Sequence, residues 1–327
     1  MNSELNFKLG RKDLYHEGRE SMHRSKIEGV FRLNFVRLIL LLGVFAACSA
    51  SVATIKKVEL PKPGSFDPST IKDIQVEALP ILPVVSPNAK AIYQAGLAAG
   101  NNGSAFSKLG DCMTENPYFL GPFGNGQYEL GKYADLKPII EQFGHAGFAR
   151  PSLAAAGGFN VAGPLDSTWA DPKICSGGES PLDCEYRLNK PSLVVIMFGT
   201  NDVAYTDADT FNFYLRSIVA ATIDKRILPL LSTFPTRPEN IEKSHQLNQI
   251  VIKVAQDYDI PIMNLNRALE PLPNHGVNVK DTQHLSVPPD QRVDVFSDAN
   301  LQYGFTLRNL VTLQAMNEVL KAVRITN

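Results

Sequence analysis

The chain has 327 residues, 44% of them hydrophobic, which is enough to bury one substantial core. Its 32 basic and 33 acidic residues leave a formal net charge of -1, so no broad positive surface is available for nucleic acids or anionic membranes. The sequence contains no internal repeat, P-loop or glycine-rich dinucleotide fingerprint, so we expect no nucleic-acid partner and no cofactor.

The first 53 residues predict a signal or membrane-targeting segment. A basic stretch up to Arg37 precedes an apolar run over residues 38–47. Three outcomes are consistent with it: lipidation of Cys48 in a lipobox-like motif, cleavage after a small residue such as Ala53, or retention as an uncleaved anchor. We therefore expect an extracytoplasmic protein, secreted or anchored to the cell membrane, that meets the membrane only through this segment.

Residues 54–90 are rich in proline and charge, a composition that favours an extended linker over packed elements. The folded domain is then predicted to span residues 91–327. Its first element is a short helix that ends in the turn at residues 100–103.

A first strand is predicted over residues 105–109. Further apolar runs bounded by turn residues predict strands at 192–198, 227–232 and 260–265. Amphipathic stretches between and after them predict helices, at 209–225, 240–258 and 306–323. Alternating strands and helices are typical of an α/β fold with a parallel, doubly wound, flavodoxin-like sheet, in which sites lie at the carboxyl ends of the strands.

Cys175 and Cys184 lie nine residues apart in a loop that contains two glycines and a proline. Such a loop can bend enough for a local disulfide, which we predict here. A zinc site is the alternative, but the loop has neither a C-x-x-C pair nor a histidine at ligand spacing, so we expect no metal.

Three polar blocks stand at or beyond the predicted strand ends. They are Gly110-Asp111-Cys112, Gly199-Thr200-Asn201-Asp202 and Asp281-Thr282-Gln283-His284. In order and spacing they resemble the SGNH (GDSL) hydrolase family over about residues 106–284. The resemblance implies a three-layer α/β/α fold and hydrolysis of esters, with a nucleophile, a histidine base and an aspartate that orients it.

Two of these blocks also support that chemistry without the resemblance. Asp281 stands three residues before His284, so its carboxylate can accept the Nδ1 proton and leave the other ring nitrogen as a base. Asn201 follows a buried strand, where its amide can donate to an oxyanion, an interaction worth about 3 kcal/mol. A loop histidine and a turn asparagine are the ordinary alternatives for each residue alone.

The resemblance implies two more oxyanion donors, the backbone N–H of Cys112 and that of a glycine in a second block. Gly158 is our choice for this glycine, with Gly157 as the alternative. Aromatic residues after the nucleophile block, such as Tyr118 and Phe123, either line a ligand groove or pack the domain.

Cys112 departs from the family pattern, which has serine at this position. A thiol ionises near pH 8.5 unaided and more readily beside an imidazolium, so Cys112 can serve as a nucleophile. A small buried residue in an inactive site is the alternative.

We therefore predict an extracytoplasmic carboxylesterase, acetylesterase or acyltransferase that uses a Cys112–His284–Asp281 triad. Its expected substrate is an acylated small molecule, an O-acylated glycan or an envelope lipid. A catalytically inactive module that binds a cell-surface glycan is the alternative, and a redox protein is disfavoured because no second cysteine lies near Cys112 in the sequence.

Overall fold

A four-stranded parallel sheet lies at the centre of residues 54–324, the part of the chain described by the computed structural model. Its strands lie side by side in the order β1 (Asn102–Gly110), β2 (Pro191–Met197), β3 (Leu228–Ser232) and β4 (Ile262–Met263). Every residue of β2 and β3 is buried, as expected for apolar strands covered on both faces.

A one-residue bridge extends the sheet beyond β1. Ala155 pairs in parallel with Gly110, whose N–H donates to Ala154 O and whose carbonyl accepts from Ala156 N, both at 3.3 Å. The chain thus leaves β1 toward one edge and then crosses back to form β2 on the other side. This reversal makes the carboxyl end of β1 the switch point of a doubly wound sheet, where ligands bind in such folds.

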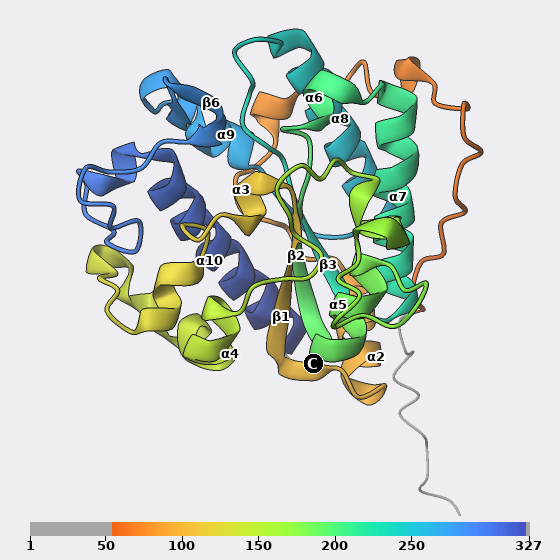
Figure 1. Cartoon of the computed structure of the whole chain (residues 1–327), viewed down its shortest axis with the longest axis horizontal. Helices are drawn as coiled ribbons and strands as arrows, with labels where there is room; N and C mark the ends of the chain where they lie inside the picture. Colours follow the sequence, from red (N-terminus) through yellow and green to blue (C-terminus); the bar gives the residue numbers. More distant parts are fainter. Residues whose placement is uncertain (1–53, 325–327) are drawn as a thin grey trace, which may run out of the picture. The chain divides into compact units, whose positions relative to one another are not determined.

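Helices cover both faces of the sheet (Figure 1). One layer contains α2 (Pro87–Ala98), α4 (Lys137–Ala149) and α10 (Gly304–Arg324), which contact one another through α10. The opposite layer contains α5 (Pro181–Asn189), α7 (Ala208–Asp224) and α8 (Ile241–Tyr258). Crossover connections between parallel strands are right-handed, so helices cover one face where the chain moves toward one edge of the sheet. They cover the opposite face where it moves toward the other edge. The predicted three-layer α/β/α fold with a parallel doubly wound sheet is confirmed.

The short elements lie at the carboxyl end of the sheet. They are α3 (Cys112–Glu115), α6 (Asp202–Tyr205), α9 (Leu265–Leu269) and the antiparallel pair β5 (Val277–Asn278) and β6 (Asp281–Leu285). Each of α3, α6 and α9 begins within five residues of the end of a parallel strand. The polar blocks of the sequence therefore gather at one end of the molecule.

The prediction that residues 54–90 form a separate linker is wrong. Ile71 and Val76 are buried in this segment, and Asn264 donates to the carbonyl of Val76 at 2.7 Å. The segment runs along the α7 and α8 layer (Figure 1), and helix α2 already begins at Pro87 rather than near residue 91. Most of the segment lacks regular secondary structure, but its scattered apolar side chains are buried against the domain.

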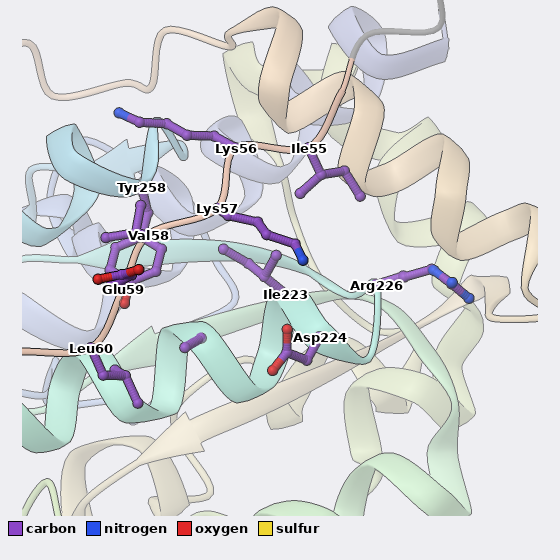
Figure 2. A pocket seen from close by; sticks show the side chains of 11 residues that line it. Ile55, Lys56, Lys57, Val58, Glu59, Leu60, Ile223, Asp224, Arg226 and Tyr258 are labelled. Carbon is purple, nitrogen blue, oxygen red and sulfur yellow. The ribbon is translucent and has the colours of Figure 1, made fainter.

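The start of this segment forms a pocket of about 530 Å³ with the end of α7 (Figure 2). Arg226 lines it and lies just before β3, so the pocket is at the amino ends of the strands, away from the polar blocks. The predicted signal segment and Cys48 fall outside the described residues. Within those residues, no helix has both the length and the apolar character needed to cross a membrane.

Cys175 and Cys184 form the predicted disulfide, with their Cα atoms 5.4 Å apart. In the described chain these two residues and Glu179 are also the only cluster with metal-ligand spacing. Because both sulfur atoms are already bonded to each other, the cluster does not offer the thiolates that zinc would need.

Candidate active site

Cys112 is the first residue of α3, directly after β1. Asp111 precedes it as the helix N-cap and accepts a hydrogen bond from Met113 N at 3.0 Å. The turn needs glycine at position 110, since a Cβ there would lie 2.3 Å from Thr114 Oγ1 and 2.4 Å from the carbonyl oxygen of Met197. The turn places Cys112, which is partly exposed, at the switch point of the sheet.

His284 and Asp281 form a hydrogen-bonded pair on β6. Nδ1 of His284 lies 2.6 Å from Oδ2 of Asp281. An ionised carboxylate only accepts, so Nδ1 carries the proton and Nε2 is left as the basic nitrogen of the neutral ring. Strand β6 contacts α3, which brings this pair to the same end of the sheet as Cys112. Among the described residues, Cys112 Sγ makes no hydrogen bond to His284.

Hydrogen bonds connect the segments that carry the candidate oxyanion donors: Gly157 bonds to Glu115 of α3, and Asn201 bonds to Phe159. Asn201 donates one amide hydrogen to Phe159 O at 2.8 Å, which fixes the side chain and leaves the other hydrogen free. Gly157 N–H donates to the Glu115 carboxylate, whereas no described residue accepts from the N–H of Gly158 or Cys112. Of the two candidate glycines, Gly158 is thus the one with an unengaged donor.

A positive-φ glycine shapes the Asn201 block. Gly199 has φ +132°, and a Cβ there would lie 2.2 Å from the ring of Phe234. Glycine tolerates both this φ and the close approach of Phe234, so it allows the turn after β2 that leads to Asn201. Asp202, next along, is buried and accepts from Val161 N at 3.0 Å and from the Thr206 hydroxyl at 2.9 Å, so its role is structural.

The thiol of Cys112 does not ionise as readily as the sequence suggested. Burial raises its pKa to about 12, and the negative charges of Asp111 and Asp281 add to the rise. The expected activation by a neighbouring imidazolium is therefore outweighed by loss of water and by two carboxylates. At neutral pH the thiol keeps its proton, so attack requires a base to remove it.

A buried arginine, whose partners could not be identified from the sequence, lies beneath the nucleophile turn. Arg308 of α10 donates to Met113 O at 2.7 Å and to Thr114 Oγ1 at 3.1 Å, and its guanidinium lies 3.6 Å from the centre of the Phe119 ring. Burial lowers its pKa to about 9, and burial raises the pKa of Asp111 to about 6. Arg308 thus ties α10 to the main chain of α3 and fixes the position of Cys112.

A second arginine links the Asn201 block to the His284 strand. Arg237 donates to Thr200 O at 3.0 Å and to the Glu239 carboxylate at 3.1 Å. Glu239 also accepts a hydrogen bond from the Thr282 hydroxyl, two residues before His284 on β6. These contacts fix the position of the Asn201 block relative to strand β6, although the two segments are far apart in the sequence.

The aromatic residues that follow Cys112 mainly pack the domain. Phe119 and Phe123 are fully buried, and the Phe123 ring lies 5.7 Å from that of Tyr128 and 6.0 Å from that of Phe148. Of the two interpretations that the sequence left open for this cluster, the structure supports packing.

Part of the chain matches a known protein family. Residues 147–287 match the GDSL-like Lipase/Acylhydrolase family, a stretch that includes Gly158, Asn201, Asp281 and His284 but begins after Cys112. The resemblance to SGNH hydrolases is therefore confirmed, although the match does not test the cysteine. No curated protein sequence matches the chain closely enough to count as a relative.

Several solved structures are similar to the chain at low sequence identity. A lipase/acylhydrolase from Enterococcus faecalis is 18% identical, with a TM-score of 0.44 over 65% of this chain and 95% of that one. A variant of an acetyl xylan esterase from Geobacillus stearothermophilus is 15% identical, with a TM-score of 0.42 over 69% and 98% of the two chains. A GDSL-like lipase from Bacteroides thetaiotaomicron is 16% identical, with a TM-score of 0.35 over 71% and 98%.

Proposed function

We propose that the chain is an extracytoplasmic ester hydrolase of the SGNH type that acts on an O-acylated glycan through Cys112, His284 and Asp281. One observation carries the proposal. The hydrogen-bonded pair of His284 and Asp281 lies on a strand that contacts α3, where the unengaged N–H groups of Cys112 and Gly158 gather with Asn201. A base and three oxyanion donors around one nucleophile are the groups that acyl transfer requires.

The reaction proceeds in two halves. Cys112 Sγ attacks the ester carbonyl while His284 Nε2 takes the thiol proton, and Asp281 stabilises the imidazolium that forms. Asn201 and the two backbone N–H groups stabilise the oxyanion. The tetrahedral intermediate then collapses to a thioester, and the alcohol leaves with the proton from His284. In the second half His284 deprotonates water, which attacks the thioester and releases the acid with regeneration of the thiol.

The proposed location has separate support. The Cys175–Cys184 disulfide is of a kind that persists in oxidising compartments, and the basic and apolar stretches of residues 1–53 are typical of export signals. The same triad chemistry would also hydrolyse an ester in an acylated small molecule or an envelope lipid. We favour a glycan because a pocket beside β6 presents hydrogen-bonding groups that match sugar hydroxyls.

The test is hydrolysis of p-nitrophenyl acetate by the full chain, with mass spectrometry of the Cys112 peptide to detect the acetyl thioester. We expect turnover and an adduct in the wild type, and loss of both in His284→Ala. Gln283→Ala is the matched control, because its side chain is exposed on the same strand. A wild-type protein with neither turnover nor adduct would rule out the hydrolase.

A catalytically silent glycan-binding module is the second candidate function. It is favoured by the raised pKa of Cys112 and by the lack, within residues 54–324, of a hydrogen bond between its thiol and His284. An inactive wild type combined with an active Cys112→Ser variant would support this module, because the scaffold would then be competent while the native residue is not.

A further inference from the structure

A pocket of about 770 Å³ opens beside the proposed catalytic strand. Its lining comes from segments that follow β3 and β4 and from the β5–β6 hairpin, and it includes Thr236, Asn266, Val279 and Thr282. Thr282 and His284 lie on the same face of β6, two residues and thus roughly 7 Å apart along the strand. The pocket is therefore at the catalytic end of the sheet, next to the base but separate from it.

Two polar residues that line this pocket, Asn266 and Thr236, each keep unused hydrogen-bonding capacity. Asn266 is only 9% exposed, and its amide nitrogen donates to Phe234 O at 3.1 Å and to Thr236 Oγ1 at 2.9 Å. Both amide hydrogens are thus used, and Oδ1 accepts no hydrogen bond from the described chain. The Thr236 hydroxyl accepts from Asn266 and has its own hydrogen left to donate, with no acceptor among the same residues. One acceptor and one donor therefore stand side by side.

This pair matches a hydroxyl group, which donates one hydrogen bond and accepts others. An acyl chain is a poor fit, because it would bury both polar groups without partners at a cost of about 1–3 kcal/mol each. No lysine or arginine is among the described residues that line the pocket, whereas Glu77 and Glu270 are. A phosphate or another anionic group is disfavoured by these carboxylates.

The walls suit the remaining surface of a sugar. Ile241 and Val279 are 63% and 67% exposed at the pocket and offer apolar contact to ring C–H groups. Glu77 lies 3.6 Å from His245, and Glu270 lies 3.5 Å from His275, so both edges present acceptors for further hydroxyls. Apolar walls with a few placed polar groups are typical of small-molecule sites.

We infer that this pocket is a carbohydrate subsite that holds the sugar part of the acylated substrate. The inference rests on the proposed function for its link to the ester, and it assigns the substrate class as a neutral, hydroxyl-rich glycan. The sugar sits beside Thr282 while its acyl group extends along β6 toward His284 and Cys112.

The experiment measures binding of sugars that carry no ester. Xylotetraose, cellotetraose and chitotetraose are titrated into the full chain by calorimetry, with Thr236→Val and Val279→Trp as variants. Val84→Trp is the matched control, because Val84 is 81% exposed and does not line the pocket. At least one sugar should bind the wild type and the control, about tenfold more weakly to Thr236→Val, and less still to Val279→Trp, which fills the pocket.

Two results would overturn the inference: no binding of any of the three sugars at millimolar concentration, or wild-type binding by Val279→Trp. Because Val279 is exposed, this variant does not disturb the core and stays informative even if Thr236→Val folds poorly. The sugars carry no ester bond for the proposed enzyme to hydrolyse, so binding without turnover of p-nitrophenyl acetate would retain the subsite and reject only the hydrolase.

Discussion

The native thiol of Cys112 should react with iodoacetamide about 50-fold more slowly than an ordinary thiol at pH 8. A pKa of about 12 in place of about 8.5 lowers the thiolate fraction about 2,000-fold at this pH. The more basic thiolate is intrinsically more nucleophilic, which restores about 40-fold with the usual Brønsted slope. The two effects together give the expected 50-fold slower alkylation, a rate that is still measurable.

The assay uses the full chain with Cys48→Ser, so that Cys112 is the free thiol, and follows alkylation by mass spectrometry from about pH 6 to about pH 10, which brackets the ordinary thiol pKa. The folded protein should show a rate that rises with pH throughout, whereas the urea-unfolded protein should level off near pH 9. Comparing the shapes of the two profiles separates ionisation from steric access.

A charge variant tests the cause of the shift. Asp281→Asn removes one of the two carboxylates that raise the pKa of Cys112, so it should speed alkylation relative to the parent at every pH. A plateau below pH 8 in the folded parent, or faster alkylation than in urea, would refute our reasoning. Either result would mean that a thiolate is stabilised in the site, with the imidazolium of His284 as its counter-ion.

Three further predictions concern the support of the site. Asn201→Ala should lower kcat for p-nitrophenyl acetate by about 100- to 1,000-fold with little change in KM, because one oxyanion donor is lost; an unchanged kcat would remove Asn201 from the site. The double variant Cys175→Ser/Cys184→Ser should lose about 3 kcal/mol of unfolding free energy in urea titrations, and an unchanged midpoint would show that the bond constrains little. Glu239→Ala should lower kcat about tenfold, since a misplaced base loses rate. Glu239→Gln should recover most of that loss, because it keeps an acceptor for Thr282; failure of Gln to recover it would contradict a positioning role.

The sheet could be predicted because its strands are unambiguous in the sequence. Residues 193–197 and 228–231 are apolar runs between turn residues, and a parallel sheet buried on both faces requires such runs. The alternation of strands and helices indicated a doubly wound parallel sheet. The polar blocks that follow β1 and β2 then had to meet, because the carboxyl ends of parallel strands lie at one edge.

The parts that the sequence could not predict depend on long-range contacts. Residues 54–90 have the composition of a linker, and only the fold reveals that Ile71 and Val76 find apolar surface. In the same way Arg237 and Arg308 donate to carbonyls that lie 37 and 195 residues away. A backbone carbonyl is present at every residue, so no pattern in the sequence marks it as the partner of a buried arginine.

The raised pKa of Cys112 makes its proposed chemistry closer to that of a serine hydrolase than to that of a cysteine protease. A protease thiol is held as a thiolate beside an imidazolium, whereas here burial and two carboxylates raise the pKa of Cys112 and favour its protonated thiol. His284 must then remove the proton during attack, as it would from a hydroxyl. A neutral thiol also resists oxidation, because the thiolate is the form that oxidants attack. This resistance reconciles an unpaired cysteine with the oxidising surroundings that the Cys175–Cys184 disulfide and the proposed export both favour.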